Sequence, residues 1–450
     1  MNKTLEKIRN AGIVGAGGAG FPAFFKLNSK VEIVLANGSE CEPCLSSDRV
    51  MMEEHFDKLV SGVLIAMDLT AAKKGIIALK DHYHLAKERL IRATKEIENI
   101  EICTLADFYP AGDEHTLVYE ATKRIIPEGA IPLNVGVLVS NVTTLINLHD
   151  ALKNDEVLIY KYVTVAGEVK TPGVYNVPIG TSFADLIMIA GGLKKTYRNA
   201  IDNIAIIDGG PMMGSVSALQ NCVQKVTGGI IVVPKDHKLI QLKSITIDEQ
   251  IKRARSACDQ CTQCTEFCPR YLNGHRIKPH MVMRDSALSK TDTAESFFAS
   301  FLCCFCGLCA VVCPCGLAPK NLYEAYKKEF INNQIRNPLT NKVDAVRINR
   351  DGKKFAISRL AQMLDVDKYN KHYAKIAYKF IPKYLKINLK PNFGNLLTPL
   401  VFEKNRVSKF EMLAIHKKDD AMAVPVHSPV DGVVEEVSEE YILIKNLYSI

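Results

Sequence analysis

The sequence predicts a multidomain α/β protein, and three observations support this fold class. The chain has 450 residues, 47% of them apolar, which is too long for one ordinary domain and enough for several cores. Near its start, segments typical of buried strands alternate with helical segments. Further along, one cysteine spacing pattern occurs twice, with short alternating strands on both sides of it. We expect these parts: domains at 1–152, 158–240, 245–335 and 406–450, and a basic helical linker at 336–405.

The first domain contains a glycine-rich loop, GAGGAGFP at 15–22. Glycines let backbone N–H groups approach an anion, and such loops cradle phosphates; a tight structural turn is the alternative. The first expected strand ends at Asn37, followed by Glu40 and Glu42. Because ligands in α/β folds bind at the carboxyl ends of strands, we expect a ligand site there. We expect strands at 31–36 and 73–83, and a helix at 84–97 after the second strand.

A β-hairpin followed by a short helix is expected in the second domain. Valines alternate across 163–169, and the turn KTPG comes next. A helix from Ser182 to Ala190 would stop at the glycine pair 191–192. This pattern resembles a soluble-ligand-binding β-grasp (SLBB) domain.

The third domain carries the two copies of C-x2-C-x2-C-x3-C-P, which is the ligand spacing of ferredoxin-like [4Fe–4S] domains. In two-cluster ferredoxins the cysteine before the proline binds the other cluster. We therefore expect one cluster on Cys258, Cys261, Cys264 and Cys313, and the other on Cys303, Cys306, Cys309 and Cys268. Two zinc sites are the alternative, although zinc does not call for this spacing. Cys304 and Cys315 lie outside the register and are not expected to be ligands.

Short alternating strands return near the C-terminus, in 424–445. This segment resembles half of a barrel-sandwich hybrid of the biotinyl/lipoyl type. Asp431 and Gly432 occupy the turn where a swinging-arm lysine would stand, so we expect a scaffold.

The net charge of +8 is modest, and basic residues gather in 320–420. We expect a solvated surface there, with docking of an acidic redox partner as the alternative and no nucleic-acid partner. No apolar run is long enough for a transmembrane segment, and the first residues do not form a signal peptide. We therefore expect a cytoplasmic protein whose cysteines are metal ligands or redox groups rather than disulfides.

Four motifs resemble a known family in their order along the chain. They are GAGGAGFP with Lys26, NGSECEP at 37–43, YPAGDEHTL at 109–117 and SNVTTL at 140–145. Together they resemble the Rossmann-like FMN-binding domain of the NADH-oxidising subunit of respiratory complex I, and more closely the RnfC-like electron-transport flavoproteins. With the domain order included, the chain resembles most closely the cobalamin reductases of propanediol-utilising microcompartments.

The resemblance implies roles for fourteen residues. Seven would hold a non-covalent FMN: Gly15, Gly17, Lys26, Asn37, Glu40, Asn141 and Thr144. Three more would line the flavin: Tyr109, Gly112 and Asp113. Four would face the nicotinamide nucleotide: Gly18, Phe21, Glu42 and Glu114. The chain departs from complex I proteins at Ala16 and Ser140, which bears on NADH use more than on FMN binding.

The resemblance implies an NADH-oxidising electron-transfer flavoprotein. Electrons would pass from NADH to FMN, to a first and then a second [4Fe–4S] cluster, and on to a partner, either a corrinoid system or a partner reductase. The β-grasp domain would be a spacer, with a small-molecule site as the alternative. A second hypothesis is a subunit of a larger redox complex that conveys electrons without meeting NADH. A bacterial microcompartment or the membrane periphery are alternative locations.

Overall fold

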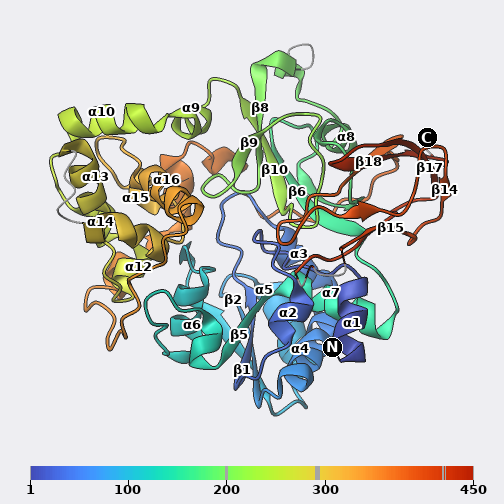
Figure 1. The fold of residues 1–450 in the computed structure, drawn as a ribbon, viewed down its shortest axis with the longest axis horizontal. Coiled ribbons are helices and arrows are strands. Elements are labelled where there is room, and N and C mark those ends of the chain that lie inside the picture. The colour runs from blue at the N-terminus through green and yellow to red at the C-terminus, as the bar shows by residue number, and fades with distance from the viewer. Residues whose placement is uncertain (1, 198–200, 289–293, 418–419, 421, 449–450) are drawn as a thin grey trace.

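The computed structural model describes residues 2–197, 201–288, 294–417, 420 and 422–448. In Figure 1 the N-terminal domain (blue) lies at the bottom, and the cysteine-rich domain (yellow) lies at the left. The β-grasp domain (green) lies at the top, and the C-terminal sheets (red) lie at the right. Within the described residues, no helix combines the length and apolar character needed to cross a bilayer.

The first domain is a parallel four-stranded sheet, ordered β3-β2-β1-β5, with helices on both faces. Alternate residues of β1 face opposite sides: Val34 packs with α4 and α7, whereas Leu35 packs with α6. Burial on both faces explains why the middle residues of the central strands, β1 and β2, are apolar. The strands are β1 (Ile33–Gly38), β2 (Lys74–Lys80), β3 (Ile100–Leu105) and β5 (Val137–Asn141). The helices are α1 (Lys3–Asn10), α2 (Ala23–Leu27), α3 (Ser47–Glu54), α4 (Phe56–Thr70), α5 (His84–Thr94), α6 (Glu114–Thr122) and α7 (Val142–Lys153).

The second domain has the β-grasp pattern that the sequence predicts. The expected hairpin is present as antiparallel β6 (Tyr160–Gly167) and β7 (Gly173–Pro178). The expected helix is α8 (Phe183–Ile189): the Ser182 side chain caps its start by accepting from Asp185 N, and both following glycines have positive φ. The other strands are β8 (Ile204–Asp208), β9 (Ser215–Ser217) and β10 (Gly229–Pro234), in the order β7-β6-β10-β8-β9.

The cysteine-rich domain is helical, and both cysteine motifs lie in the loops and short helical turns between its longer helices. Its helices pack around Leu322 and Tyr323, which are both fully buried. A connecting helix, α9 (Lys238–Ser244), precedes the domain. The domain's helices are α10 (Ile247–Ala257), α11 (Gln263–Glu266), α12 (Pro269–Leu272), α13 (Pro279–Leu288), α14 (Ala294–Phe298), α15 (Leu308–Val311) and α16 (Pro319–Asn332).

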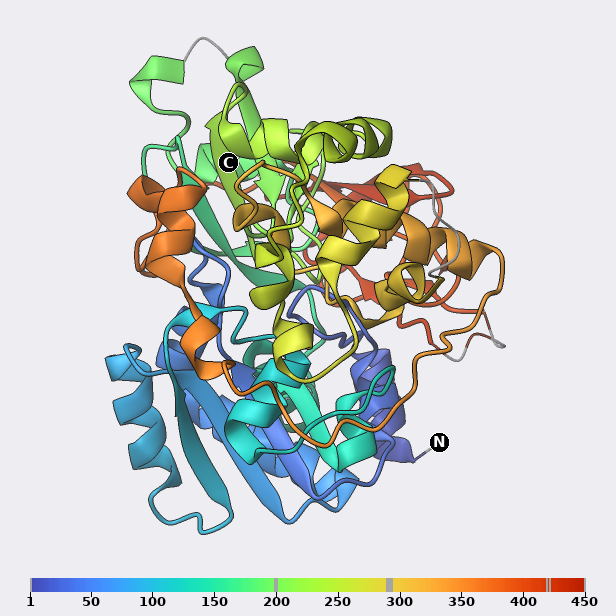
Figure 2. The same ribbon diagram turned by 90° about the vertical axis from the view of Figure 1, so that its left-hand side faces the viewer.

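The segment 336–405 differs from the helical linker expected from the sequence. Residues 336–383 hold one α-helix, α17 (Ile357–Met363), and otherwise run mainly as an irregular strap across the other domains (Figure 2). From residue 384 the chain enters the C-terminal sheets. Strand β11 (Phe355–Ala356) pairs with β4 (Phe108–Tyr109) of the first domain. The side chains of Phe355, Tyr369 and Tyr373 are buried against neighbouring domains, and this packing overrides the local helical preference.

The C-terminal unit is a sandwich of two small sheets, β12-β18-β17-β14 and β13-β15-β16. Strand β12 (Tyr384–Asn388) pairs with β18 (Tyr441–Asn446), so the unit begins before residue 406, where the sequence placed its boundary. Asp431 lies in the bend before β17 (Gly432–Val437), and Gly432 is the first residue of that strand. The remaining strands are β13 (Thr398–Pro399), β14 (Arg406–Val407), β15 (Met412–Ile415) and β16 (Val426–His427).

One hydrophobic core joins three of these domains and the strap. It contains Val50 and Tyr109 from the first domain, Met212 from the β-grasp domain and Cys306 from the cysteine-rich domain. The domains are therefore held in fixed positions around the ligand site described next.

Candidate functional site

A cavity of about 390 Å³ opens at the carboxyl ends of β1 and β5, where the sequence placed a ligand site. Its volume lies within the range of roughly 300–1,000 Å³ that is usual for cofactor sites. Twelve of the fourteen predicted contact residues line it: Gly15, Gly17, Phe21, Lys26, Asn37, Glu40, Glu42, Gly112, Asp113, Glu114, Asn141 and Thr144. The two exceptions are Gly18 and Tyr109.

The glycine loop forms one wall of the cavity and is closed by its own backbone. Gly15 N donates to Phe21 O at 2.8 Å, and Gly20 N donates to Gly15 O at 3.2 Å. Gly18 has a φ of +108°, and a Cβ there would meet nothing within 4 Å, so it faces open space rather than the cavity. A side chain at Gly17 would contact Asn141 at 3.4 Å. The loop therefore leaves room beside its backbone, as a phosphate-binding loop requires.

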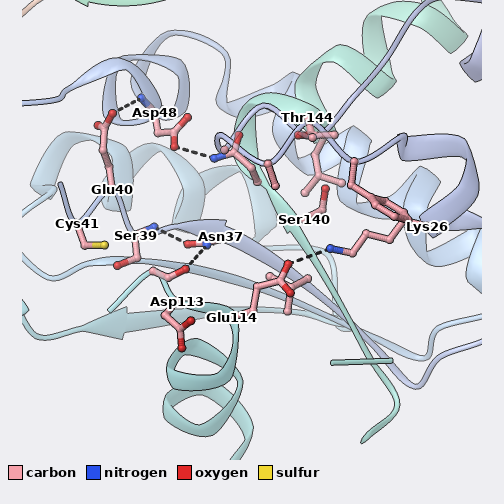
Figure 3. Close-up of a pocket in the computed structure, with 18 of the residues that line it drawn as sticks. Lys26, Asn37, Ser39, Glu40, Cys41, Asp48, Asp113, Glu114, Ser140 and Thr144 are labelled. Carbon is pink, nitrogen blue, oxygen red and sulfur yellow. Dashed lines mark hydrogen bonds and ion pairs between the residues drawn. The ribbon is translucent and has the colours of Figure 1, made fainter. Parts of the chain in front are cut away.

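The third motif meets both the first and the second motif at hydrogen-bond distance. Lys26 Nζ and Glu114 Oε1 lie 3.0 Å apart and face each other in Figure 3. Asn37 Nδ2 donates to Gly112 O at 3.0 Å. A Cβ at Gly112 would come within 2.5 Å of Ser39 O, so this close approach requires glycine. The motifs predicted separately are thus parts of one wall.

Asp113 has a structural role in addition to lining the cavity. Its carboxylate caps α6 by accepting from Thr116 N at 3.1 Å, and it pairs with Arg270 of α12 at 2.8 Å. It therefore links the first domain to the cysteine-rich domain.

Two buried carboxylates lie side by side on the cavity wall. Glu40 accepts from Ser47 Oγ at 3.0 Å and from backbone N–H groups at the start of α3. Burial, and then the nearby charge of Asp48, raises the pKa of Glu40 to about 7. Asp48 accepts from Asn141 Nδ2 at 2.7 Å and from Thr143 Oγ1 at 3.0 Å. Burial also raises the pKa of Asp48.

Glu42 holds a loop of the β-grasp domain against the cavity. Its carboxylate accepts from Met212 N at 2.9 Å and from Met213 N at 2.8 Å. A Cβ at Gly210 would lie 2.2 Å from Glu42 Oε2, so the approach requires glycine there. The sequence predicted only that Glu42 faces the nicotinamide; the structure gives its oxygens backbone partners.

Tyr109 lies behind the cavity rather than on its surface. Its ring is 1% exposed, and its hydroxyl donates to Cys306 O at 2.7 Å. Cys306 itself lines the cavity, as does its neighbour Cys304. The flavin-type domain and the second cysteine motif are therefore in direct contact.

The spacing predicts two crossed groups among the eight motif cysteines, and this grouping stays a prediction. Burial raises the pKa of the Cys264 thiol to about 12, and Cys313, Cys258 and Cys261 are the thiols that raise it most. Among the described residues, no three metal-ligating side chains converge as ligands of a single ion do. Burial raises the pKa of the Cys303 thiol, and the thiols that raise it further are, in order, Cys304, Cys309 and Cys268.

Several cavity residues were not predicted from the sequence. They are Ala19, Ser39, Cys41, Asp48, Pro110, Ser140, Met213, Cys304 and Cys306. Ser39, Cys41 and Ser140 lie within the recognised motifs, so the adjacent predicted residues indicated that they could line the cavity too. Asp48 and Met213 gave no local signal, because only the tertiary fold brings α3 and the β-grasp loop to the cavity.

The donor set and shape of this cavity suit FMN. A glycine loop with accessible backbone and the Lys26 cation are the groups that bind a phosphate, and Asn37 and Asn141 supply hydrogen-bonding groups. Phe21 and Leu138 provide apolar surface for a ring.

Comparison with known proteins agrees with this assignment. Residues 8–150 match the Nuo51 FMN-binding domain, 162–216 the SLBB domain and 257–318 the 4Fe-4S dicluster domain. These matches confirm the predicted fold class and cofactor types.

Three relatives illustrate how far the similarity extends. The cobalamin reductase PduS of Citrobacter freundii is 34% identical over 446 residues, which cover 98% of this chain and 95% of that protein. The PduS of Salmonella typhimurium is 35% identical over 443 residues, covering 98% and 95%. One component of the proton-translocating ferredoxin:NAD(+) oxidoreductase complex of Clostridium ljungdahlii is 35% identical over 279 residues, 61% of this chain and 57% of that component.

Proposed function

Since this chain belongs to the family of the PduS cobalamin reductases, we propose that it takes electrons from NADH and delivers them singly to a protein redox partner. It is an electron-transferring oxidoreductase with an FMN-binding domain and a [4Fe–4S] dicluster domain. When bound, FMN supplies the conversion of a hydride into single electrons, and each cluster carries one electron.

One observation carries the proposal: the cavity that suits FMN and a cluster-binding cysteine share a wall. Cys306 lines the cavity, and its carbonyl is held by Tyr109. The group of Cys303, Cys306, Cys309 and Cys268 is therefore the one next to the flavin site. Cys261 belongs to the other group and is the exposed member of the eight. In this proposal electrons leave the protein at the first cysteine motif.

The chain's own residues bind and orient the flavin in this proposal. The glycine loop and Lys26 hold the phosphate, and Asn37, Glu40, Asn141 and Thr144 fix the ring system and ribityl chain. Hydrogen bonds within the wall keep these side chains in place: Thr144 Oγ1 accepts from Ala16 N at 2.9 Å, and Asn141 is held by Asp48. A site organised before binding loses less entropy on binding.

For the nicotinamide nucleotide, Phe21 and Glu114 are the residues best placed. Phe21 lines the cavity and packs edge-on against Phe393 of the C-terminal unit, with ring centroids 5.1 Å apart. Glu114 lies at the cavity beside Lys26, and its side chain is 44% exposed. Glu42 acts here by holding the 209–214 loop, and Gly18 lies at the open edge of the glycine loop.

The terminal acceptor is a corrinoid system or a partner reductase. The name of the two PduS relatives favours the corrinoid, and the Clostridium relative favours the alternative, a protein that conveys electrons within a larger complex. In that alternative the chain would not react with NADH.

An anaerobic titration of the reconstituted protein with NADH tests the proposal. We expect flavin and cluster absorbance to bleach at near-stoichiometric NADH, with reduced [4Fe–4S] signals in electron paramagnetic resonance. A protein that contains flavin and iron but is not reduced by NADH would contradict the proposal and support the alternative.

A further inference from the structure

The β-grasp domain places a buried lysine against the flavin-type domain. Lys161 lies on β6, and the residue is 4% exposed. Its Nζ donates to Ala16 O at 3.3 Å, inside the glycine loop. A lysine is almost never buried without charged or polar partners, because desolvating the ammonium is costly. The groups around its ammonium therefore indicate the role of Lys161.

The ammonium of Lys161 contacts the loop carbonyl, and the two carboxylates of the cavity wall are the charges that act on it. Burial lowers the pKa of Lys161, whereas the charges of Asp48 and Glu40 raise it. In return, the charge of Lys161 opposes the effect of burial on the pKa of Asp48. Asp48 and Glu40 both line the cavity, so one cation from another domain balances the negative charge beside the ligand site.

The same lysine is one of two side chains that hold the backbone of Ala16. Thr144 Oγ1 of α7 accepts from Ala16 N at 2.9 Å. Lys161 Nζ of β6 donates to Ala16 O. Asp48 accepts from Asn141 and Thr143 at the start of the same helix, α7. The backbone of Ala16, between the two cavity glycines, is thus held by both domains, at its N–H and at its carbonyl.

We propose that Lys161 is a positioning residue of the flavin site: the β-grasp domain supplies the buried cation that fixes the glycine loop and balances Asp48 and Glu40. This inference rests on the proposed function of the cavity as the FMN site. Without Lys161, two carboxylates beside the cavity would oppose the anionic phosphate of FMN, and the Ala16 carbonyl would lose its donor. The β-grasp domain would then be part of the flavin site rather than a spacer.

The chain offers a matched control in Lys225. This lysine lies in the loop before β10 of the same domain, and burial lowers its pKa to about 7. Its Nζ donates to two backbone carbonyls, Gly12 O at 2.7 Å and Pro425 O at 2.8 Å. It is not among the residues that line the cavity. Lys225→Met therefore removes a buried ammonium with carbonyl partners without touching the carboxylate pair.

The experiment measures FMN affinity of flavin-free protein by quenching of flavin fluorescence, together with the reduction potential of bound FMN. We expect Lys161→Met to weaken FMN binding at least about tenfold, because losing a charge interaction equivalent to one pKa unit changes an equilibrium constant by that factor. The reduction potential of bound FMN should shift to more negative values. Lys161→Arg should retain most of the affinity. Lys225→Met should change the affinity less than twofold, whatever its effect on thermal stability.

A charge-balanced double variant keeps the proposal falsifiable if Lys161→Met folds poorly. Lys161→Met with Asp48→Asn removes one charge of each sign and should recover part of the lost affinity. Wild-type FMN affinity and potential in Lys161→Met would overturn the proposal, and so would an equal loss in Lys225→Met. The measurement needs no NADH, so a wild-type protein that binds FMN without being reduced by NADH would contradict the proposed function and leave this inference standing.

Discussion

Replacing Glu42 with alanine tests whether one carboxylate holds the β-grasp loop over the cavity. The substitution removes the acceptor of two hydrogen bonds, from Met212 N and Met213 N. Hydrogen bonds to a charged group contribute roughly 1.5–3 kcal/mol each. Part of this is offset, because the carboxylate no longer has to be buried, and Met213 is 55% exposed, so water can reach its N–H. We therefore expect a net loss of about 2–3 kcal/mol in the free energy of unfolding.

Urea denaturation provides the assay. The chain has no tryptophan and 16 tyrosines, so far-ultraviolet circular dichroism and tyrosine fluorescence are suitable probes. The control is Glu114→Ala, which removes a half-exposed ion pair with Lys26 and should cost less than about 1 kcal/mol. Glu42→Gln should lie between the two, because it keeps one acceptor oxygen. If Glu42→Ala and Glu114→Ala unfolded at the same urea concentration, the reasoning about the loop would be refuted.

Three further predictions follow from the same geometry. The pKa of Glu40 is raised from 4.5 to about 7 in the folded state, so the folded protein binds the proton more tightly than the unfolded chain. This stabilisation is fully present below pH 4.5 and is lost as the pH rises through 7, by at most about 1.4 kcal/mol per pH unit. Glu40→Gln should flatten this dependence of the free energy of unfolding on pH, measured in denaturation curves. An unchanged pH dependence would contradict the assignment. Tyr109→Phe removes the hydrogen bond to Cys306 O and should lower the free energy of unfolding by about 1 kcal/mol. It should also shift the reduction potential of one cluster but not of the other. If neither potential shifted, the result would count against a wall shared by the cavity and the second cysteine motif. Cys258→Ser should lower the iron content by about four atoms per chain, whereas Cys304→Ser should leave it unchanged, and loss of iron in Cys304→Ser would make Cys304 a ligand.

The sequence alone was sufficient where function depends on short stretches of chain. The cysteine spacing predicted the [4Fe–4S] dicluster domain, because the ligand pattern of such a domain lies in two short stretches of chain. The glycine loop and the three motifs after it predicted most of the cavity lining, since each motif keeps its local geometry at the end of a strand. The hairpin and α8 were likewise predicted, because Ser182 and the glycine pair after the helix are local start and stop signals.

The tertiary structure decided everything that depends on contacts between domains. Nothing in the local sequence of Lys161 or Asp48 indicates that they meet at the glycine loop, because they belong to separate domains. The carboxylate of Glu42 suggested a ligand contact, yet its oxygens accept hydrogen bonds from the backbone of a loop some 170 residues away. The segment 336–405 was expected to be helical, yet it holds only α17 as an α-helix, and Phe355 and Tyr373 on either side of α17 are buried in the core shared between domains. Local spacing therefore determined which cofactors this protein carries, and only long-range packing determined which cluster adjoins the flavin site and which domains build that site.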